Sequence, residues 1–193
     1  GANPRERAGD GRTLLHAAIK HERSADWIRF LVVQGVDPAI ASADGNTPIH
    51  TLLQELGRTH SFNFYAQKML PVLVDIGVPP LASNAKEQTA LHLAKDVHIL
   101  ECIAAASYFQ GLDVNQPDIN GFTPLHFAVQ LGDVAASVLI KSGANPMALS
   151  ATGLSPLHLA ALLGEGGAVV MLLAKYREHG VLENYVNMFG EGK

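Results

Sequence analysis

The sequence predicts an all-α fold, a solenoid of stacked helix-turn-helix units joined by β-turn loops, because one short pattern recurs along the chain. A Thr or Ser followed three residues later by His opens five segments, at residues 13, 47, 89, 123 and 155, with steps of 34, 42, 34 and 32 residues. A glycine lies 12 residues before each start. Five agreements in register are hard to obtain by chance. The copies are Thr13-Leu14-Leu15-His16, Thr47-Pro48-Ile49-His50, Thr89-Ala90-Leu91-His92, Thr123-Pro124-Leu125-His126 and Ser155-Pro156-Leu157-His158.

Each copy of the pattern predicts the start of a short helix. Thr or Ser is a favourable N-cap, because its side-chain oxygen accepts a hydrogen bond from a free amide of the first turn. Proline follows in three units at the first helical position, where its missing N–H costs nothing. A small residue recurs at one position of these helices and lets neighbouring helices approach closely. It is Ala18, Ala94, Ala128 and Ala160.

A second helix and a tight turn complete each unit. Apolar runs such as 27–33 and 134–140 predict the second helix, and a glycine at its end suits a left-handed C-terminal cap. Between that glycine and the next motif lie dipeptides that favour tight turns with positive φ. They are Asp10-Gly11, Asp44-Gly45 and Asn120-Gly121.

In motif, period and glycine register, the chain resembles the ankyrin-repeat family, whose unit of about 33 residues pairs a turn with two antiparallel helices. The resemblance covers 1–193, which we interpret as one domain. It implies a curved solenoid with turns and first helices lining a concave side, each unit burying its apolar face against its neighbours. Residues 1–4 repeat the pattern of 143–146, and a partial next unit is predicted from about residue 186. We therefore expect a piece of a longer array or protein, without polar capping units.

Two units depart from the pattern. The second is about eight residues too long, with the excess near 57–65, between its helices. Leu52 replaces the small alanine of that unit, and Pro71 falls inside its second helix, where we expect a kink. In the third unit Glu87 stands where the turn usually has glycine, so we expect a different turn conformation there.

Composition excludes several classes of protein. Of the 193 residues, 48% are apolar and 17% charged, which excludes disorder for most of the chain. The net charge of −4 argues against nucleic-acid binding, which needs a basic surface. No apolar run is long enough for membrane insertion, and no signal peptide is visible. A single cysteine favours a reducing, intracellular location, cytoplasmic or nuclear.

The five motif histidines suggest two interpretations, a row of metal ligands or a structural device. Successive units should place them about 10 Å apart, too far to share a metal ion at about 2.1 Å per ligand. We therefore expect each imidazole to bond near its own cap and to tie adjacent turns together. Cys102 lies in an apolar helical segment and is expected to be buried. No catalytic, cofactor or metal site is predicted, and this chain is not expected to be an enzyme.

The surface that folding leaves free is the candidate binding site, namely the turn tips and the exposed side of the first helices. Units four and five carry apolar residues there, which predicts a partner site: Ile119, Phe122, Leu131, Leu154 and Leu162. Units one and two carry polar residues, expected to provide selectivity: Arg12, Lys20, Gln54 and Glu55. We expect Phe122 and Leu154 to anchor a peptide or partner helix. The alternatives are that a longer array covers these groups or that they pack on each other.

The aromatic residues of the insertion are a second candidate. Phe62, Phe64 and Tyr65 are interpreted either as a protruding recognition finger or as side chains that fold back over the gap near Leu52 and Pro71. We favour the second interpretation.

Taken with the resemblance, these features predict a protein-protein interaction scaffold that binds a protein or peptide segment on its concave face. The alternative is a targeting or regulatory module of a larger enzyme or effector whose catalytic domain lies outside these residues. The sequence leaves the oligomeric state open.

Overall fold

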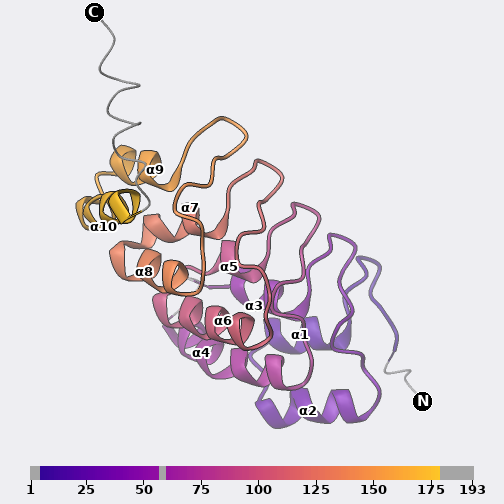
Figure 1. Cartoon of the computed structure of the whole chain (residues 1–193). Coiled ribbons are helices and arrows are strands. Elements are labelled where there is room, and N and C mark those ends of the chain that lie inside the picture. Colours follow the sequence, from indigo (N-terminus) through magenta and orange to yellow (C-terminus); the bar gives the residue numbers. More distant parts are fainter. Residues whose placement is uncertain (1–4, 57–59, 179–193) are drawn as a thin grey trace, which may run out of the picture.

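The computed structural model describes residues 5–56 and 60–178 and shows a stack of helical hairpins (Figure 1). The described residues form helices and turns, without a β-strand. The turns project to one side of the stack and the second helices lie on the other, with the first helices between them (Figure 1). The predicted all-helical repeat fold is confirmed. The predicted partial unit from about residue 186 lies outside the described residues.

The units follow one another along the stack in the order of the sequence. The first helices are α1 (Leu14–Lys20), α3 (Pro48–Gln54), α5 (Ala90–Leu93), α7 (Pro124–Ala128) and α9 (Pro156–Leu163). The second helices are α2 (Ala25–Val33), α4 (His60–Asp75), α6 (Val97–Phe109), α8 (Asp133–Lys141) and α10 (Gly166–Glu178), and a short 3₁₀ segment, η1 (Val129–Leu131), follows α7.

The predicted caps are present in every unit. The capping Thr or Ser has an extended backbone, with φ from −76° to −96°. The His three residues later accepts the N–H of the capping residue, so it takes the part that Glu or Gln plays in an ordinary capping box. The recurring alanines are 0–6% exposed and lie between packed helices, as expected from their size. Local sequence preferences therefore set where each first helix begins.

The structure changes the interpretation of the second unit. Its second helix α4 begins at His60, so Phe64 and Tyr65 belong to a helix and not to a loop between helices. Leu52, in place of alanine, is fully buried. Pro71 lies inside α4, and the kink expected there stays a prediction. Residues 57–59 of the insertion lie outside the described residues.

The turn of the third unit does not have the different conformation that its sequence suggested. Glu87 has φ +58°, in the same left-handed region as Gly45 (+72°) and Gly121 (+77°) of the neighbouring units. Its N–H bonds to the Asn84 carbonyl at 2.9 Å, as the Gly45 N–H does to Ser42 at 2.9 Å. The hydrogen bonds to the adjacent turns hold this turn in the common shape, at the cost of a left-handed non-glycine residue.

Replacing Glu87 by glycine is expected to raise the free energy of unfolding by about 0.5–1 kcal/mol, because glycine relieves the left-handed strain. Lys86→Gly is the matched control, since Lys86 has no positive φ and gains nothing from glycine. Urea unfolding should show opposite signs for the two variants. Equal destabilisation by both would contradict the strain interpretation.

Cys102 also differs from expectation, because it is exposed and not buried. It lies on α6 between the buried Leu100 and Ile103, on the solvent side of that helix. Partial burial, together with the charges of Glu101 and Asp96, raises the pKa of the Cys102 thiol. The raised pKa disfavours the nucleophilic thiolate.

Candidate functional site

The motif histidines form a line of hydrogen bonds that runs through the stack. Nδ1 of His16, His50, His92 and His126 accepts the N–H of its own capping threonine at 3.0–3.2 Å. Nε2 therefore carries the proton and donates to a backbone carbonyl of the next unit. The acceptors are Asn46, Gln88, Phe122 and Leu154, at 2.9, 2.8, 3.1 and 3.0 Å.

These hydrogen bonds confirm the structural interpretation of the histidines. The four rings are 0–4% exposed, and burial lowers their pKa values below 6.5, partly offset by the backbone hydrogen bonds. Each ring is neutral and uses both nitrogens, which leaves no lone pair for a metal ion. Each imidazole joins one helix cap to the next turn, and together they fix the position of the predicted binding surface.

The residues before the caps are therefore less free than the sequence suggested. Asn46 is 9% exposed, and its Oδ1 accepts from Gln54 Nε2 and Asn84 Nδ2, both at 3.1 Å. Gln54, predicted to contact a partner, is exposed but already bonds within its own unit. This part of the surface is a fixed polar network.

The predicted apolar residues divide into two groups. Ile119 and Leu162 are 62% and 72% exposed, so neither contributes much to the core. Phe122 and Leu154 are half-buried, and the Phe122 ring lies edge-on to His126 with 5.3 Å between ring centroids. Leu131 is half-buried and packs against the core. Ile119 and Leu162 are thus the freest members of the set.

The predicted polar residues lie on the first two units. Arg12 contacts Asp10, with Nε 3.4 Å from Oδ2. Lys20 is exposed in the last turn of α1, and Glu55 is the half-buried C-cap of α3. The structure places all three on the side of the first helices and turns, away from the apolar residues of units four and five.

The aromatic residues of the insertion take different environments. Tyr65 folds back and donates from its hydroxyl to the Arg23 carbonyl at 3.0 Å. Burial, with a smaller contribution from the Glu22 carboxylate, raises the pKa of Tyr65 to about 12. Phe64 is 60% exposed, with Lys68 Nζ 4.2 Å from the centre of its ring. The side chain of Phe62 lies outside the described residues. Tyr65 therefore folds back onto the first unit, and Phe64 does not. That these side chains cover the gap near Leu52 and Pro71 stays a prediction.

Sequence reasoning missed an exposed aromatic pair in the first unit. Trp27 and Phe30 stack on α2 with ring centroids 5.3 Å apart and are 48% and 47% exposed. The sequence pattern assigned the run 27–33 to a second helix without separating its faces. A comparison of equivalent positions between units could have identified this pair, because Trp27 aligns with residues that are buried in the later units.

Comparisons with known proteins agree with the repeat fold. A model for three ankyrin repeats matches residues 99–183, and a model for a single ankyrin repeat matches residues 10–43. The putative ankyrin repeat protein FPV222 of Fowlpox virus (strain NVSL) is 31% identical over 132 residues, covering 68% of this chain and 16% of that protein. Alpha-latrotoxin-Lh1a of Latrodectus hasselti is 30% identical over 138 residues, covering 69% of this chain and 9% of that protein.

A third relative is the putative palmitoyltransferase ZDHHC13 of Danio rerio, 31% identical over 136 residues, covering 69% of this chain and 19% of that protein. The chain thus spans less than a fifth of the length of these relatives. None of the helices in the described residues has the length and apolar character to cross a bilayer. The repeated caps, the inter-unit histidines and the matching family models together show that the chain belongs to the ankyrin-repeat family.

Proposed function

We propose that this array of ankyrin repeats, a type of module that generally mediates protein interactions, binds a protein or peptide segment on its concave face. The observation that carries the proposal is the exposure of Ile119 and Leu162, at 62% and 72%, in the same two units as the half-buried Phe122 and Leu154. Exposed apolar side chains with an aromatic neighbour are typical of binding hot spots. The histidine ties hold the surface rigid, which limits the entropy lost on binding.

The chemistry of the surface favours an apolar segment with a polar flank. Units four and five supply the aliphatic and aromatic contacts, whereas Arg12, Lys20 and Glu55 supply charged groups at the other end. An extended peptide or partner helix lying along the stack would meet both regions. Unit one would then contribute selectivity and units four and five most of the affinity.

A variant with Ile119→Ser and Leu162→Ser is expected to weaken peptide binding about tenfold, since each loses an exposed apolar contact. Because both residues are exposed, the melting temperature should stay unchanged. The probes are peptides selected from a phage-displayed random library against the unmodified chain, with affinities measured by calorimetry. Val134→Ser is the matched control, because Val134 is 57% exposed on α8, on the side of the second helices.

The result distinguishes a binding role for these apolar residues from a purely structural one. Selected peptides that bind the double variant as tightly as the unmodified chain would contradict the proposal. The Phe122→Ser and Leu154→Ser variant should lose both affinity and stability, because these two residues are half-buried. Equal stability with unchanged affinity in that variant would remove them as anchors.

A second function follows from the relatives. The chain aligns with 19% of a protein named as a putative palmitoyltransferase, so these repeats also fit a targeting or regulatory module within a larger enzyme. On this proposal the repeats would hold a protein substrate for a catalytic domain elsewhere. We also propose an intracellular location, cytoplasmic or nuclear, supported by the exposed and free Cys102 thiol, which suits a reducing compartment.

A further inference from the structure

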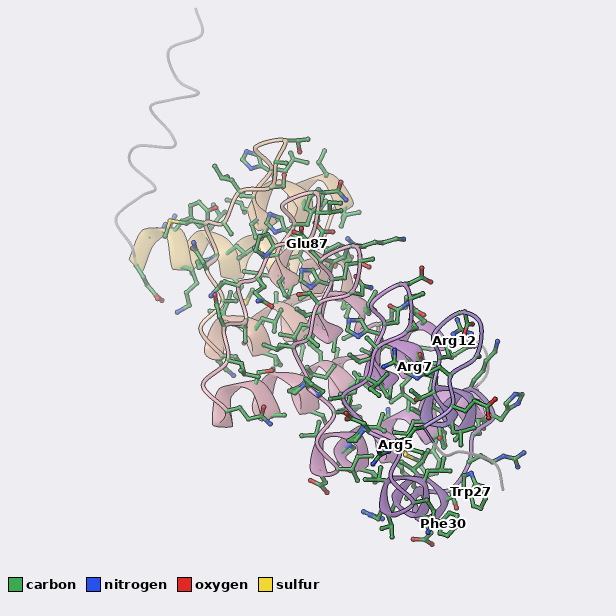
Figure 2. The ribbon with its side chains drawn as sticks, turned by 90° about the vertical axis from the view of Figure 1, so that its right-hand side faces the viewer. Arg5, Arg7, Arg12, Trp27, Phe30 and Glu87 are labelled. Atoms are coloured by element: carbon green, nitrogen blue, oxygen red, sulfur yellow. The ribbon has the colours of Figure 1, made fainter. Side chains whose placement is uncertain are left out.

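The first unit exposes an apolar face at the end of the stack. Leu14, Trp27 and Phe30 are 43%, 48% and 47% exposed, although α1 and α2 otherwise follow the common pattern. Figure 2 looks toward this end and shows Trp27 and Phe30 at the edge of α2, pointing away from the rest of the stack. We call the surface formed by these three residues and the first turn the leading face.

The positions equivalent to Leu14 and Trp27 are buried in later units, whereas the residues at the Phe30 position are half-buried; they are Val72, Ala106 and Val138. Leu14 directly follows its cap, and all residues at that position in the other units are buried; they are Pro48, Ala90, Pro124 and Pro156. Trp27 lies 8 residues before the glycine that ends its second helix, and its counterparts are 0–3% exposed; they are Met69, Ile103 and Ala135. Ile103 and Ala135 lie on α6 and α8, and each of these helices packs against the second helix of the preceding unit.

Two backbone groups of the leading face lie at positions that, in later units, hydrogen-bond to the preceding unit. In each of the four later units, the backbone N–H four residues before the cap donates to a backbone carbonyl of the preceding turn, at 2.9–3.1 Å. The group at this position in unit one is the Gly9 N–H. The carbonyl just before the cap accepts from the histidine of the preceding unit, and here it belongs to Arg12. The Gly9 N–H and the Arg12 carbonyl are thus one donor and one acceptor at the positions where a preceding unit would form hydrogen bonds.

The cavity at this face fits the same interpretation better than a ligand pocket. It measures about 380 Å³, opens between the first turn and α1, and is lined by unit one alone. Its lining mixes the acidic Glu6 and Asp10 with the basic Arg7, Arg12 and Lys20, which gives no preference for an anion. We therefore do not interpret the cavity as a site for a small charged ligand.

We propose that the leading face is a docking surface for a further ankyrin-type helical hairpin, stacked in the register of the later units. The occupant carries a histidine three residues after its cap, whose Nε2 donates to the Arg12 carbonyl, and a turn carbonyl that accepts the Gly9 N–H. Its apolar side covers Leu14, Trp27 and Phe30, which continues the interface already present between successive units.

The chain itself supplies a matched occupant for the test. Residues 111–142 form one complete unit that ends at a Gly-Ala-Asn-Pro sequence, and the chain begins with the same four residues. An added copy of 111–142 fused ahead of Gly1 therefore recreates the junction found at 142–146. Trp27 is the single tryptophan of the chain, so its fluorescence reports on the leading face alone.

In the extended chain, acrylamide quenching of Trp27 is expected to fall about threefold and its emission to shift to shorter wavelength, because Trp27 should become as buried as its counterparts. The melting temperature should rise by about 4 °C or more. Changing the added copy of His126 to Ala should reduce that rise. In a Trp27→Phe, Val33→Trp reporter the quenching should not change, because Val33 is 80% exposed and its counterparts Asp75 and Lys141 are exposed within the stack.

A second extended chain controls for the possibility that the copy of 111–142 does not fit the leading face. A copy of residues 1–34 carrying Trp27→Phe in the added part gives an independent hairpin with the same junction register. Unchanged quenching of Trp27 in both extended chains would overturn the proposal. Self-association of the unextended chain with Trp27 protected, seen by light scattering and quenching together, would also overturn it, because the occupant would then be a second copy.

Discussion

Replacing Gly121 with alanine is expected to lower the free energy of unfolding by about 3 kcal/mol, the sum of left-handed strain and a steric clash. Gly121 has φ +77°, and a Cβ there would lie 2.5 Å from the Ala151 nitrogen of the next turn. That nitrogen bonds to the Asn120 carbonyl at 3.0 Å, so the clash falls on the contact between units four and five. The two turns must separate to make room.

Gly153→Ala separates the two contributions. Gly153 has nearly the same φ, +78°, but no atom of the described residues lies within 4 Å of a Cβ placed there. This variant should therefore lose only about 1 kcal/mol from strain. Urea unfolding measures both, and hydrogen exchange at the Ala151 amide should speed up in Gly121→Ala alone. Equal losses in the two variants would show that the contact between turns contributes nothing.

The stability of the stack is expected to fall as the pH drops below 6.5, because four buried histidines tie the units together in their neutral form. Burial lowers the pKa values of His16, His50, His92 and His126, so the unfolded chain binds protons more readily than the folded one. The stabilisation is fully present above 6.5 and is lost as the pH falls through the folded pKa values. Each histidine contributes a slope of up to about 1.4 kcal/mol per pH unit in that window.

His126→Gln tests one link of this line. Glutamine still caps its own helix but does not reach the Leu154 carbonyl, so the variant should lose about 2 kcal/mol above pH 6.5 and less below it. His98→Gln is the matched control, since His98 is 76% exposed and makes no bond to another unit. Urea unfolding across the pH range measures the slope. An unchanged slope in His126→Gln would contradict the proposed linkage.

The repeat architecture was predictable because its determinants are local. A capping Thr, a Pro at the first helical position and a His three residues after the cap act within one helical turn, so Thr123, Pro124 and His126 identify a helix start without tertiary information. The role of the histidines was predictable for a related reason. Imidazoles at a fixed position in each unit are separated by the unit spacing, which excludes a shared metal ion.

Exposure was harder to predict, because it depends on what the neighbouring unit presents. Cys102 lies in an apolar run yet faces solvent, and Asn46 lies before a cap yet is buried in a polar network. The amphipathic period of a single helix does not reveal these contacts. The candidate site shows the same limit, since Phe122 was identified by position but its half-burial against His126 was not.

The amino-acid sequence alone determined where the first helices of the described units begin, because their caps are specified by neighbouring residues. Only the tertiary structure decided that Glu87 adopts the left-handed turn of its glycine counterparts and that Trp27 lacks the cover that its counterparts have. Both depend on stacking. One turn hydrogen-bonds to the next and shapes it, and one hairpin buries the face of its neighbour, which are interactions between residues about 30 or more apart.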